Sequence, residues 1–286
     1  MTNNSFIQLI RIKQWIKNFV IFLPVFFAGN KIEFSIYINL FQAFIAFSFI
    51  TSAVYILNDI IDREDDINHP IKKYRPIASN KIKVKVAGFN GVLLGFFGLV
   101  YLLLFEYGAL VPALFYATLM ILYCFLFRKI AILDVLVISI GFVLRLFIGG
   151  EVAGTPISIW IIIMVFLLAL FISFSKRRDD LINNNSYGRE SLKHYNLSFV
   201  ETVICILVPV IIVTYILYCT SDSNILRVGE YLYLTTLFVI SGFLRYLQLV
   251  FVENDGGDPV QLFYNDSALK VIVLSWIITF GGLLYF

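Results

Sequence analysis

Charged side chains are scarce in this sequence. Of its 286 residues only 14% are charged and 60% are hydrophobic, and the mean hydropathy is +0.88. Such a composition excludes a soluble globular domain of this size. Cysteine is also rare, and Cys124, Cys205 and Cys219 show neither metal-ligand nor disulfide spacing. We therefore interpret the three cysteines as packing residues within apolar segments.

Long apolar runs fill most of the chain. A bilayer core about 30 Å thick requires roughly 20 apolar residues per helix. Nine segments are candidates for such helices: 15–29, 34–57, 86–105, 109–127, 130–150, 157–174, 200–219, 231–252 and 268–286. Segments such as 161–174 are apolar on every side, which excludes the alternating pattern of membrane barrel strands. The first segment contains Pro24 and lacks a small-residue cleavage site, so we expect a retained helix. The sequence predicts one all-α membrane domain spanning residues 1–286.

Lys and Arg are distributed unevenly between the connections of these nine segments. If the N-terminus is cytoplasmic, 17 of the 22 Lys and Arg residues fall on the cytoplasmic side. The outer side then keeps only Lys31 and Arg227. We predict a multi-pass protein of the inner (cytoplasmic) membrane, with cytoplasmic loops 58–85 and 175–198 and the C-terminal Phe286 outside. The net charge of +3 fits anionic lipids or phosphate groups and gives no reason to expect nucleic-acid binding.

Four glycines in the third apolar segment are spaced three, four and three residues apart. They are Gly88, Gly91, Gly95 and Gly98. Because this spacing places them on one helical face, and small residues let membrane helices approach closely, we expect a packing face. The segment lacks the strand and turn of a dinucleotide-binding loop, which excludes that function.

An acidic row follows the second apolar segment. Asn58, Asp62 and Asp66 recur every four residues, and Asp59 lies three residues before Asp62. On a continuing helix all four side chains project to one side. Carboxylates at this spacing repel one another unless a cation lies among them, and ligands that are all oxygen atoms favour Mg²⁺. Magnesium in proteins usually bridges one or two carboxylates and a substrate diphosphate. The alternative is a solvated loop of mixed charge that anchors the topology.

Basic residues follow the acidic row closely. Lys72 and Arg75 could bind the diphosphate oxygens that the metal leaves free. His69 and His194 are interpreted as hydrogen-bonding partners. Two further arginines, Arg145 and Arg245, fall inside apolar segments, where a charge is costly and tends to face a cavity or a partner. Arg245 could bind a phosphate or form an ion pair with an acid such as Glu253. Arg145 shares its helix with Asp134, but the two residues lie too far apart along the helix to form an ion pair.

These motifs resemble the UbiA family of intramembrane prenyltransferases. Residues 58–66 match its first aspartate-rich motif. Further matches resemble the family's decaprenyl-phosphate phosphoribosyltransferase branch and are found in residues 13–18, 69–79, 144–150, 176–195 and 258–266. Two positions depart from the pattern, since Asn80 replaces a usual glycine and Asp180 a usual glutamate. The second aspartate row of the aromatic prenyltransferases is absent, and the second loop is instead mostly basic.

The resemblance implies a nine-helix bundle with a cytoplasm-facing cavity, and a Mg²⁺-dependent transfer of a 5-phosphoribosyl group from phosphoribosyl diphosphate to a polyprenyl phosphate. It assigns catalysis and metal binding to Asp59, Asp62 and Asp66. It assigns substrate binding to Lys17, Asn18, Asn58, Lys72, Arg75, Lys176, Arg177, Asp180 and Arg189. Membrane lipids are the only other expected partners. The alternatives left open are a prenyltransferase acting on an aromatic acceptor and a transporter or lipid-binding protein without chemistry.

Overall fold

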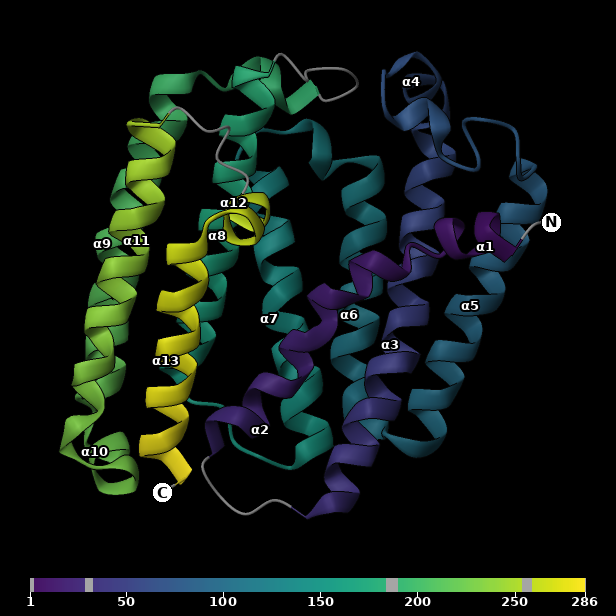
Figure 1. Ribbon diagram of the computed structural model, residues 1–286. Helices are drawn as coiled ribbons and strands as arrows, with labels where there is room; N and C mark the ends of the chain where they lie inside the picture. Colours follow the sequence, from purple (N-terminus) through teal and green to yellow (C-terminus); the bar gives the residue numbers. More distant parts are fainter. Residues whose placement is uncertain (1–2, 29–32, 184–189, 254–258, 286) are drawn as a thin grey trace. The chain divides into compact units, whose positions relative to one another are not determined.

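The computed structural model describes residues 3–28, 33–183, 190–253 and 259–285, and all regular structure in these ranges is helical (Figure 1). The all-α prediction is therefore confirmed. The described residues form two compact units. The first contains residues 3–28, 33–157 and 190, and the second contains residues 158–183, 191–253 and 259–285.

The first unit begins with short helices and continues with long ones. Its elements are α1 (Asn3–Leu9), the 3₁₀ helix η1 (Ile12–Phe22), α2 (Leu23–Ala28), α3 (Phe34–Ile61), α4 (Arg63–Asn68), η2 (Lys72–Tyr74), α5 (Val84–Phe105), α6 (Tyr107–Phe125), η3 (Phe127–Lys129) and α7 (Leu133–Ala153). Helix α3 packs along α5, and α6 packs along α7. Most of the buried core of this unit comes from apolar side chains of α3, α6 and α7, and Ile21, Val25 and Leu102 add to it from η1, α2 and α5.

The second unit contains the remaining elements. They are α8 (Ile159–Ile182), η4 (Glu190–His194), α9 (Leu197–Cys219), α10 (Asp222–Val228), η5 (Glu230–Thr235), α11 (Thr236–Phe251), α12 (Pro259–Asn265) and α13 (Ser267–Tyr285). Polar contacts tie these apolar helices together. Arg178 of α8 donates to Glu201 of α9 at 2.9 Å and to the Val250 carbonyl of α11 at 3.3 Å. The buried guanidinium group of Arg178 is thus hydrogen-bonded, as its desolvation requires.

Eight helices in the described residues are long and apolar enough to cross a membrane, one fewer than predicted. They are α3, α5, α6, α7, α8, α9, the combined η5 and α11, and α13. The predicted first helix, 15–29, is instead the 3₁₀ helix η1 followed by the short helix α2. The prediction of nine continuous membrane helices is therefore wrong in the described part of the chain.

Contacts with α3 explain why the first segment is a 3₁₀ helix. Arg11 lies beside Asp59 of α3, and the Phe22 ring lies 5.8 Å from the Phe44 ring. The stretch from Arg11 to Phe22, which is 11 residue-to-residue steps, thus runs antiparallel to the stretch of α3 from Phe44 to Asp59, which is 15 steps. A 3₁₀ helix rises about 2.0 Å per residue and an α-helix about 1.5 Å, so the two stretches match at about 22 Å. Only the more extended helix covers this length of α3.

The predicted glycine face is confirmed as a packing face. A Cβ atom added at each of its four glycines would meet a residue of α3. The contact is closest at Gly98, where the added atom would lie 2.5 Å from the Ala46 carbonyl oxygen. The cysteine prediction holds for Cys124 and Cys219, which are buried, and fails for Cys205, which is exposed on α9.

Gly149 of α7 allows η1 to pack directly on α7. An added Cβ atom would lie 1.9 Å from the carbonyl oxygen of Ile21, so backbone would have to move. Gly149→Ala is therefore expected to destabilise the protein by about 1–3 kcal/mol, the usual cost of overpacking. Thermal unfolding in detergent measures the change. Gly281→Ala is the matched control, because nothing lies within 4 Å of the added atom in α13. An unchanged melting temperature in Gly149→Ala would contradict this close packing.

Candidate active site

The acidic row lies where α3 ends and α4 begins. The amide of Asp62 donates to the Asn58 carbonyl at 2.9 Å, and the amide of Asp66 donates to the Asp62 carbonyl at 2.8 Å. Helical hydrogen bonding thus continues past the formal break at Asp62, as the sequence predicted. Asp59 and Asp66 are both 3% exposed. The row is therefore a set of adjacent turns with two deeply buried carboxylates.

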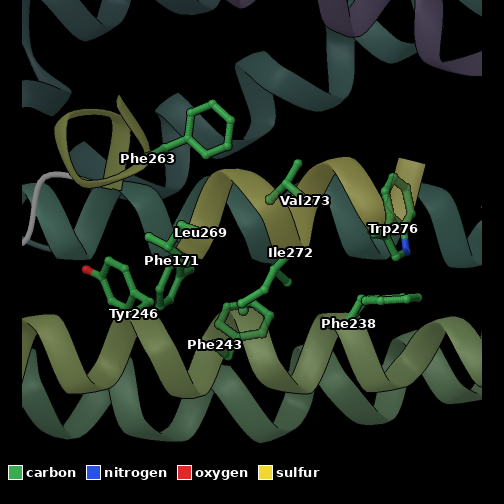
Figure 2. Close-up of a pocket in the computed structure, with 11 residues that line it drawn as sticks. Phe171, Phe238, Phe243, Tyr246, Phe263, Leu269, Ile272, Val273 and Trp276 are labelled. Carbon is green, nitrogen blue, oxygen red and sulfur yellow. The ribbon is translucent and has the colours of Figure 1, made fainter. Parts of the chain in front are cut away.

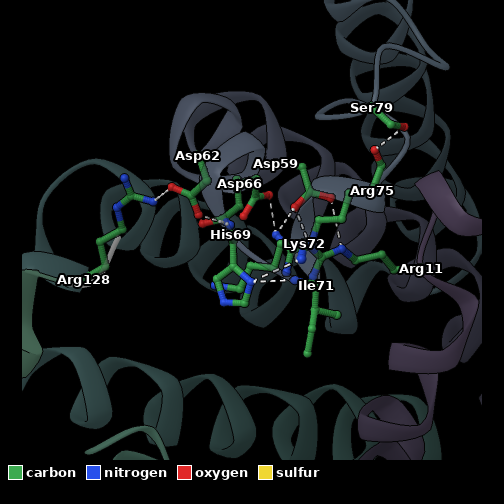
Figure 3. Close-up of polar contacts among 11 residues, drawn as sticks. Arg11, Asp59, Asp62, Asp66, His69, Ile71, Lys72, Arg75, Ser79 and Arg128 are labelled. Atoms are coloured by element: carbon green, nitrogen blue, oxygen red, sulfur yellow. Dashed lines mark hydrogen bonds and ion pairs between the residues drawn. The ribbon is translucent and has the colours of Figure 1, made fainter. Parts of the chain in front are cut away.

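Asp59 and Asp66 converge on one guanidinium group (Figure 3). Nη1 of Arg75 lies 3.1 Å from Oδ1 of Asp59 and 2.6 Å from Oδ2 of Asp66. Arg11 approaches Asp59 from η1 with two nitrogens, with Nε at 3.1 Å from Oδ2 and Nη2 paired to Oδ1. A positive charge therefore stands between the two carboxylates, and a second positive charge lies against Asp59.

Asp62 has a separate set of partners (Figure 3). Nη1 of Arg128, from η3, forms an ion pair with Asp62 Oδ1. The side-chain amide of Asn58 donates to Asp62 Oδ2 at 2.8 Å. Side chains four residues apart are neighbours on a helix, in line with the expectation that Asn58 and Asp62 project to one side. The structure thus divides the acidic row into two pairs, Asn58 with Asp62 and Asp59 with Asp66.

Arg11, Arg75 and Arg128 neutralise the carboxylates of this site. Of these three arginines, only Arg75 is predicted from the sequence as a site residue. Arg11 and Arg128 belong to no local motif and count only among the 17 Lys and Arg residues expected on the cytoplasmic side. Arg11 carries one signal that is visible only in the structure, a left-handed backbone with φ of 51°. Such a conformation is uncommon for a residue other than glycine and marks a position held by its surroundings. Arginine side chains gathered in this way suit a polyanionic substrate, because guanidinium groups form charge-assisted hydrogen bonds to phosphate oxygens.

The electrostatics of Asp66 reflect its burial. Burial raises the pKa of the Asp66 carboxyl above its ordinary value, while the charges of Arg75 and Lys72 act in the opposite direction. The side chain of Lys72, from η2, is half-buried. Lys72 thus lies near enough for its charge to act on Asp66, whereas its predicted role in binding diphosphate stays a prediction.

The donor atoms suit a hard divalent cation held by few protein ligands. No three His, Cys, Asp or Glu side chains lie close enough to hold a metal ion in the described ranges. Asp59 and Asp66, however, share one cationic partner, and their ligand atoms are all oxygen. Because Mg²⁺ commonly uses one or two carboxylates and completes its shell with water and substrate phosphate, this pair fits it.

Other predicted residues of the first unit have different surroundings. His69 accepts hydrogen bonds on Nδ1 from the amides of Ile71 and Lys72 at 3.1 and 3.3 Å, in line with the predicted bonding role. Lys17 is exposed on η1, and Asn18 is 1% exposed. The Asn18 amide donates to Ser48 and Thr51 of α3, at 2.9 and 3.2 Å.

Arg145 is the second partner of Asn18. Its Nε donates to Asn18 Oδ1 at 2.9 Å, and its Nη2 donates to the Tyr116 hydroxyl at 3.0 Å. The guanidinium group is 4% exposed, lies 4.7 Å from the Tyr116 ring and 5.0 Å from the Phe142 ring, and forms no ion pair within the described residues. These contacts favour a positioning role for Asn18, whereas its predicted role in substrate binding stays a prediction.

The predicted residues of the second loop lie in the second unit. Arg177, at the end of α8, is 2% exposed and lies 3.4 Å from Asp180. Lys176 is exposed beside it, and Arg189 lies outside the described residues. Arg245 of α11 forms ion pairs with Glu253 at 2.9 Å and Asp266 at 2.7 Å. The ion-pair alternative for Arg245 is therefore the one that the structure supports.

The sequence model of the UbiA prenyltransferase family matches residues 18–273 of this chain. The chain is 29% identical to "Decaprenyl-phosphate phosphoribosyltransferase" of Mycolicibacterium smegmatis, over 99% of this chain and 93% of that protein. It is 28% identical to the protein of the same name from Corynebacterium glutamicum, over 96% of this chain and 85% of that one. The structure of a UbiA homolog from Archaeoglobus fulgidus, bound to DMAPP and Mg²⁺, superposes with a TM-score of 0.72 at 15% identity and covers 98% of each chain.

Together with the eight long apolar helices, these matches define the class of protein. The chain belongs to the UbiA prenyltransferase family and is a multi-pass integral membrane protein. The family resemblance predicted from the motifs is confirmed.

Proposed function

We propose that this protein transfers the 5-phosphoribosyl group of phosphoribosyl diphosphate to a polyprenyl phosphate and releases diphosphate. The observation that carries the proposal is the similarity, over nearly the whole chain, to two relatives named as decaprenyl-phosphate phosphoribosyltransferases. The three paired arginines of the acidic site support it. A guanidinium group binds phosphate oxygens as readily as carboxylate oxygens, so each arginine can exchange an aspartate for a substrate phosphate.

Asp59 and Asp66 would hold Mg²⁺ in this reaction, with Asp62 as the further predicted ligand. A bound Mg²⁺ ion would stabilise the charge that develops on the leaving diphosphate. Arg75 would then donate to phosphate oxygens from its place between the carboxylates. Arg11 and Arg128 add two further positive charges. Cationic groups already in position favour the transition state, because they need no reorganisation as charge develops.

The acceptor requires no general base from the protein. The second pKa of a phosphate monoester is about 6, so a polyprenyl phosphate is largely ionised at neutral pH and can attack the anomeric carbon directly. This agrees with the surroundings of His69, whose Nδ1 is occupied by backbone amides. We assign no residue to proton transfer.

A lipid-labelling assay tests the proposal. Purified protein is incubated with phosphoribosyl diphosphate labelled in the ribose, a polyprenyl phosphate and Mg²⁺. We expect label in the lipid fraction and stoichiometric release of diphosphate. The control incubation contains a polyprenyl diphosphate and an aromatic acceptor, the substrates of the alternative function. Prenylation of the aromatic ring without transfer of ribose would reject the proposal and leave only the family assignment.

Arg177 is proposed to bind a phosphate that a prenyl diphosphate does not carry. A hydrogen bond to a charged group contributes about 1.5–3 kcal/mol, so Arg177→Ala is expected to raise the KM for phosphoribosyl diphosphate about ten- to a hundredfold. The KM for polyprenyl phosphate should change much less. Steady-state kinetics with each substrate varied in turn measure both values. Lys193→Ala, which removes an exposed charge from the same loop, should change neither. Equal effects of Arg177→Ala on both substrates would contradict donor specificity.

The membrane orientation is proposed from the distribution of Lys and Arg, with residues 58–85 and 175–198 in the cytoplasm. Cysteine labelling in intact cells tests it, in a background where the exposed Cys205 is replaced by Ala. A cysteine at Asn183 should resist an impermeant reagent. A cysteine at Thr220 should react with the reagent. This exposed residue caps the end of α9, which starts at Leu197, and therefore lies on the other side of the membrane from Asn183. The reverse result would invert the topology. Phe286, the predicted outer terminus, lies outside the described residues.

A further inference from the structure

The second unit contains an apolar slot between α11 and α13, closed by residues of α8 and α12 (Figure 2). Its volume is about 260 Å³. More than half of its lining residues are aromatic, and these are Phe171, Phe238, Phe243, Tyr246, Phe263 and Trp276. Figure 2 shows side chains of α11 facing those of α13 across the slot. The lining thus offers almost nothing but apolar surface.

The lining keeps the slot open. Aromatic rings are flat and rigid, so they fill a void less readily than the flexible Met side chain does. Three of the lining rings support one another by edge contacts, since the centroid of Phe171 lies 5.3 Å from that of Phe243 and 4.9 Å from that of Tyr246. Gly242 leaves space in the wall of the slot, because it has no side chain. Packing does not require a glycine at this position, since an added Cβ atom would make only an ordinary 3.7 Å contact with Ile272. Space of this size between stiff side chains is suited to an apolar occupant.

The volume sets the size of that occupant. An engineered protein cavity of about 150 Å³ binds benzene, which has six carbons. By the same ratio the slot accommodates roughly ten carbons, the length of two isoprene units. It runs along α13 from Leu269 to Trp276, a rise of seven residue-to-residue steps or about 10 Å. A stretch of a long chain fits this shape better than a compact molecule.

Lys270 places a positive charge near one end of the slot, because it follows the lining residue Leu269. Arg245 precedes the lining residue Tyr246, but its charge is balanced by ion pairs with Glu253 and Asp266. The Lys270 ammonium donates to the Tyr264 carbonyl at 3.2 Å and has no carboxylate partner within the described residues. An apolar slot with a positive charge at one end suits a lipid with an anionic head and an apolar chain.

We propose that this slot binds a segment of the isoprenoid chain of the polyprenyl phosphate acceptor, with the phosphate toward the Lys270 end. This inference rests on the proposed function, which supplies the acceptor. The wide slot takes the methyl branches of an isoprenoid, and its aromatic faces lie against the chain's double bonds. The slot thereby contributes to selecting an isoprenoid over an ordinary acyl chain.

Filling the slot tests the proposal kinetically. Gly242→Leu places a branched side chain in the space between α11 and α13. Its KM for polyprenyl phosphate is expected to rise at least about tenfold, since several apolar carbons lose their contacts, while the KM for phosphoribosyl diphosphate stays unchanged. Ser241→Leu adds the same side chain on the exposed side of α11 and should alter neither value. An unchanged acceptor KM in a folded Gly242→Leu protein would overturn the proposal.

Photolabelling tests the slot without turnover and without a variant. Wild-type protein in phosphatidylcholine vesicles is irradiated with a diazirine-bearing polyprenyl phosphate or, separately, a diazirine-bearing phosphatidylcholine. We expect the isoprenoid probe to label peptides containing Phe263 and Trp276 at least about tenfold more strongly. Equal labelling by both probes would show bulk lipid in the slot and overturn the inference. If the wild type labels as expected but transfers no ribose, the proposed function fails and the isoprenoid site stands.

Discussion

Asp66→Asn is expected to reduce phosphoribosyl transfer about a thousandfold while leaving the protein folded. The substitution removes one of the two carboxylates that converge on Arg75, and with it a proposed Mg²⁺ ligand. A metal ion contributes several kcal/mol of charge stabilisation in the transition state, and each 1.36 kcal/mol corresponds to tenfold in rate. Initial rates at saturating Mg²⁺ and both substrates measure the loss. Chelation of Mg²⁺ by EDTA should abolish turnover in the wild type, and excess Mg²⁺ should restore it.

The chain supplies a close control for this substitution. Asp65 is adjacent to Asp66 on α4 and is exposed. Asp65→Asn makes the same chemical change one residue away and should keep the wild-type rate. Asp62→Asn should behave like Asp66→Asn, although Asp62 is held by Arg128 and Asn58. Near-normal rates in Asp66→Asn, or activity that survives EDTA, would remove the metal from the proposed mechanism.

Asn18→Leu is expected to destabilise the protein and impair donor binding together. The Arg145 guanidinium is buried and without an ion pair in the described residues, so loss of the Asn18 oxygen leaves its Nε unsatisfied. An unsatisfied buried group costs about 1–3 kcal/mol, and more when it is charged. Asn18 also ties η1 to α3, seven residues after Arg11. When η1 loosens, Arg11 should leave Asp59, and the KM for phosphoribosyl diphosphate should rise at least about tenfold.

Asn18→Asp separates positioning from direct contact with substrate. The carboxylate can still accept from Arg145 and converts the contact into a buried ion pair. It cannot donate to α3 as the Asn18 amide does, but the Ser48 hydroxyl can rotate to donate to it, so the tie between η1 and α3 is kept. We expect a melting temperature close to that of the wild type, together with most of the wild-type affinity for the donor. Thermal unfolding in detergent and the donor KM should thus change in parallel across the two variants. If Asn18→Asp were stable but lost donor binding as fully as Asn18→Leu, direct binding would replace positioning.

The apolar runs alone predicted the helical class and most of the helices. Runs of about 20 apolar residues have few other solutions in a membrane, because every backbone amide must be satisfied within the segment. The glycine spacing in α5 also predicted its packing face, since helix periodicity is a local property. The motif of residues 58–66 indicated the family and placed the acids on adjacent turns. In each case the signal lies within one helix or one loop.

Contacts between distant residues decided the rest. Arg11 meets Asp59 across 48 residues, and Arg128 meets Asp62 across 66, so no local pattern marks either arginine as part of the site. The same holds for Asn18 and Arg145, which are 127 residues apart. Tertiary contacts with α3 also gave residues 12–22 a 3₁₀ conformation in place of the predicted membrane helix. The sequence by itself determined which segments are helical and where the acids lie, because both depend on local periodicity. The partners of each charge depended on packing, which the tertiary structure alone decides.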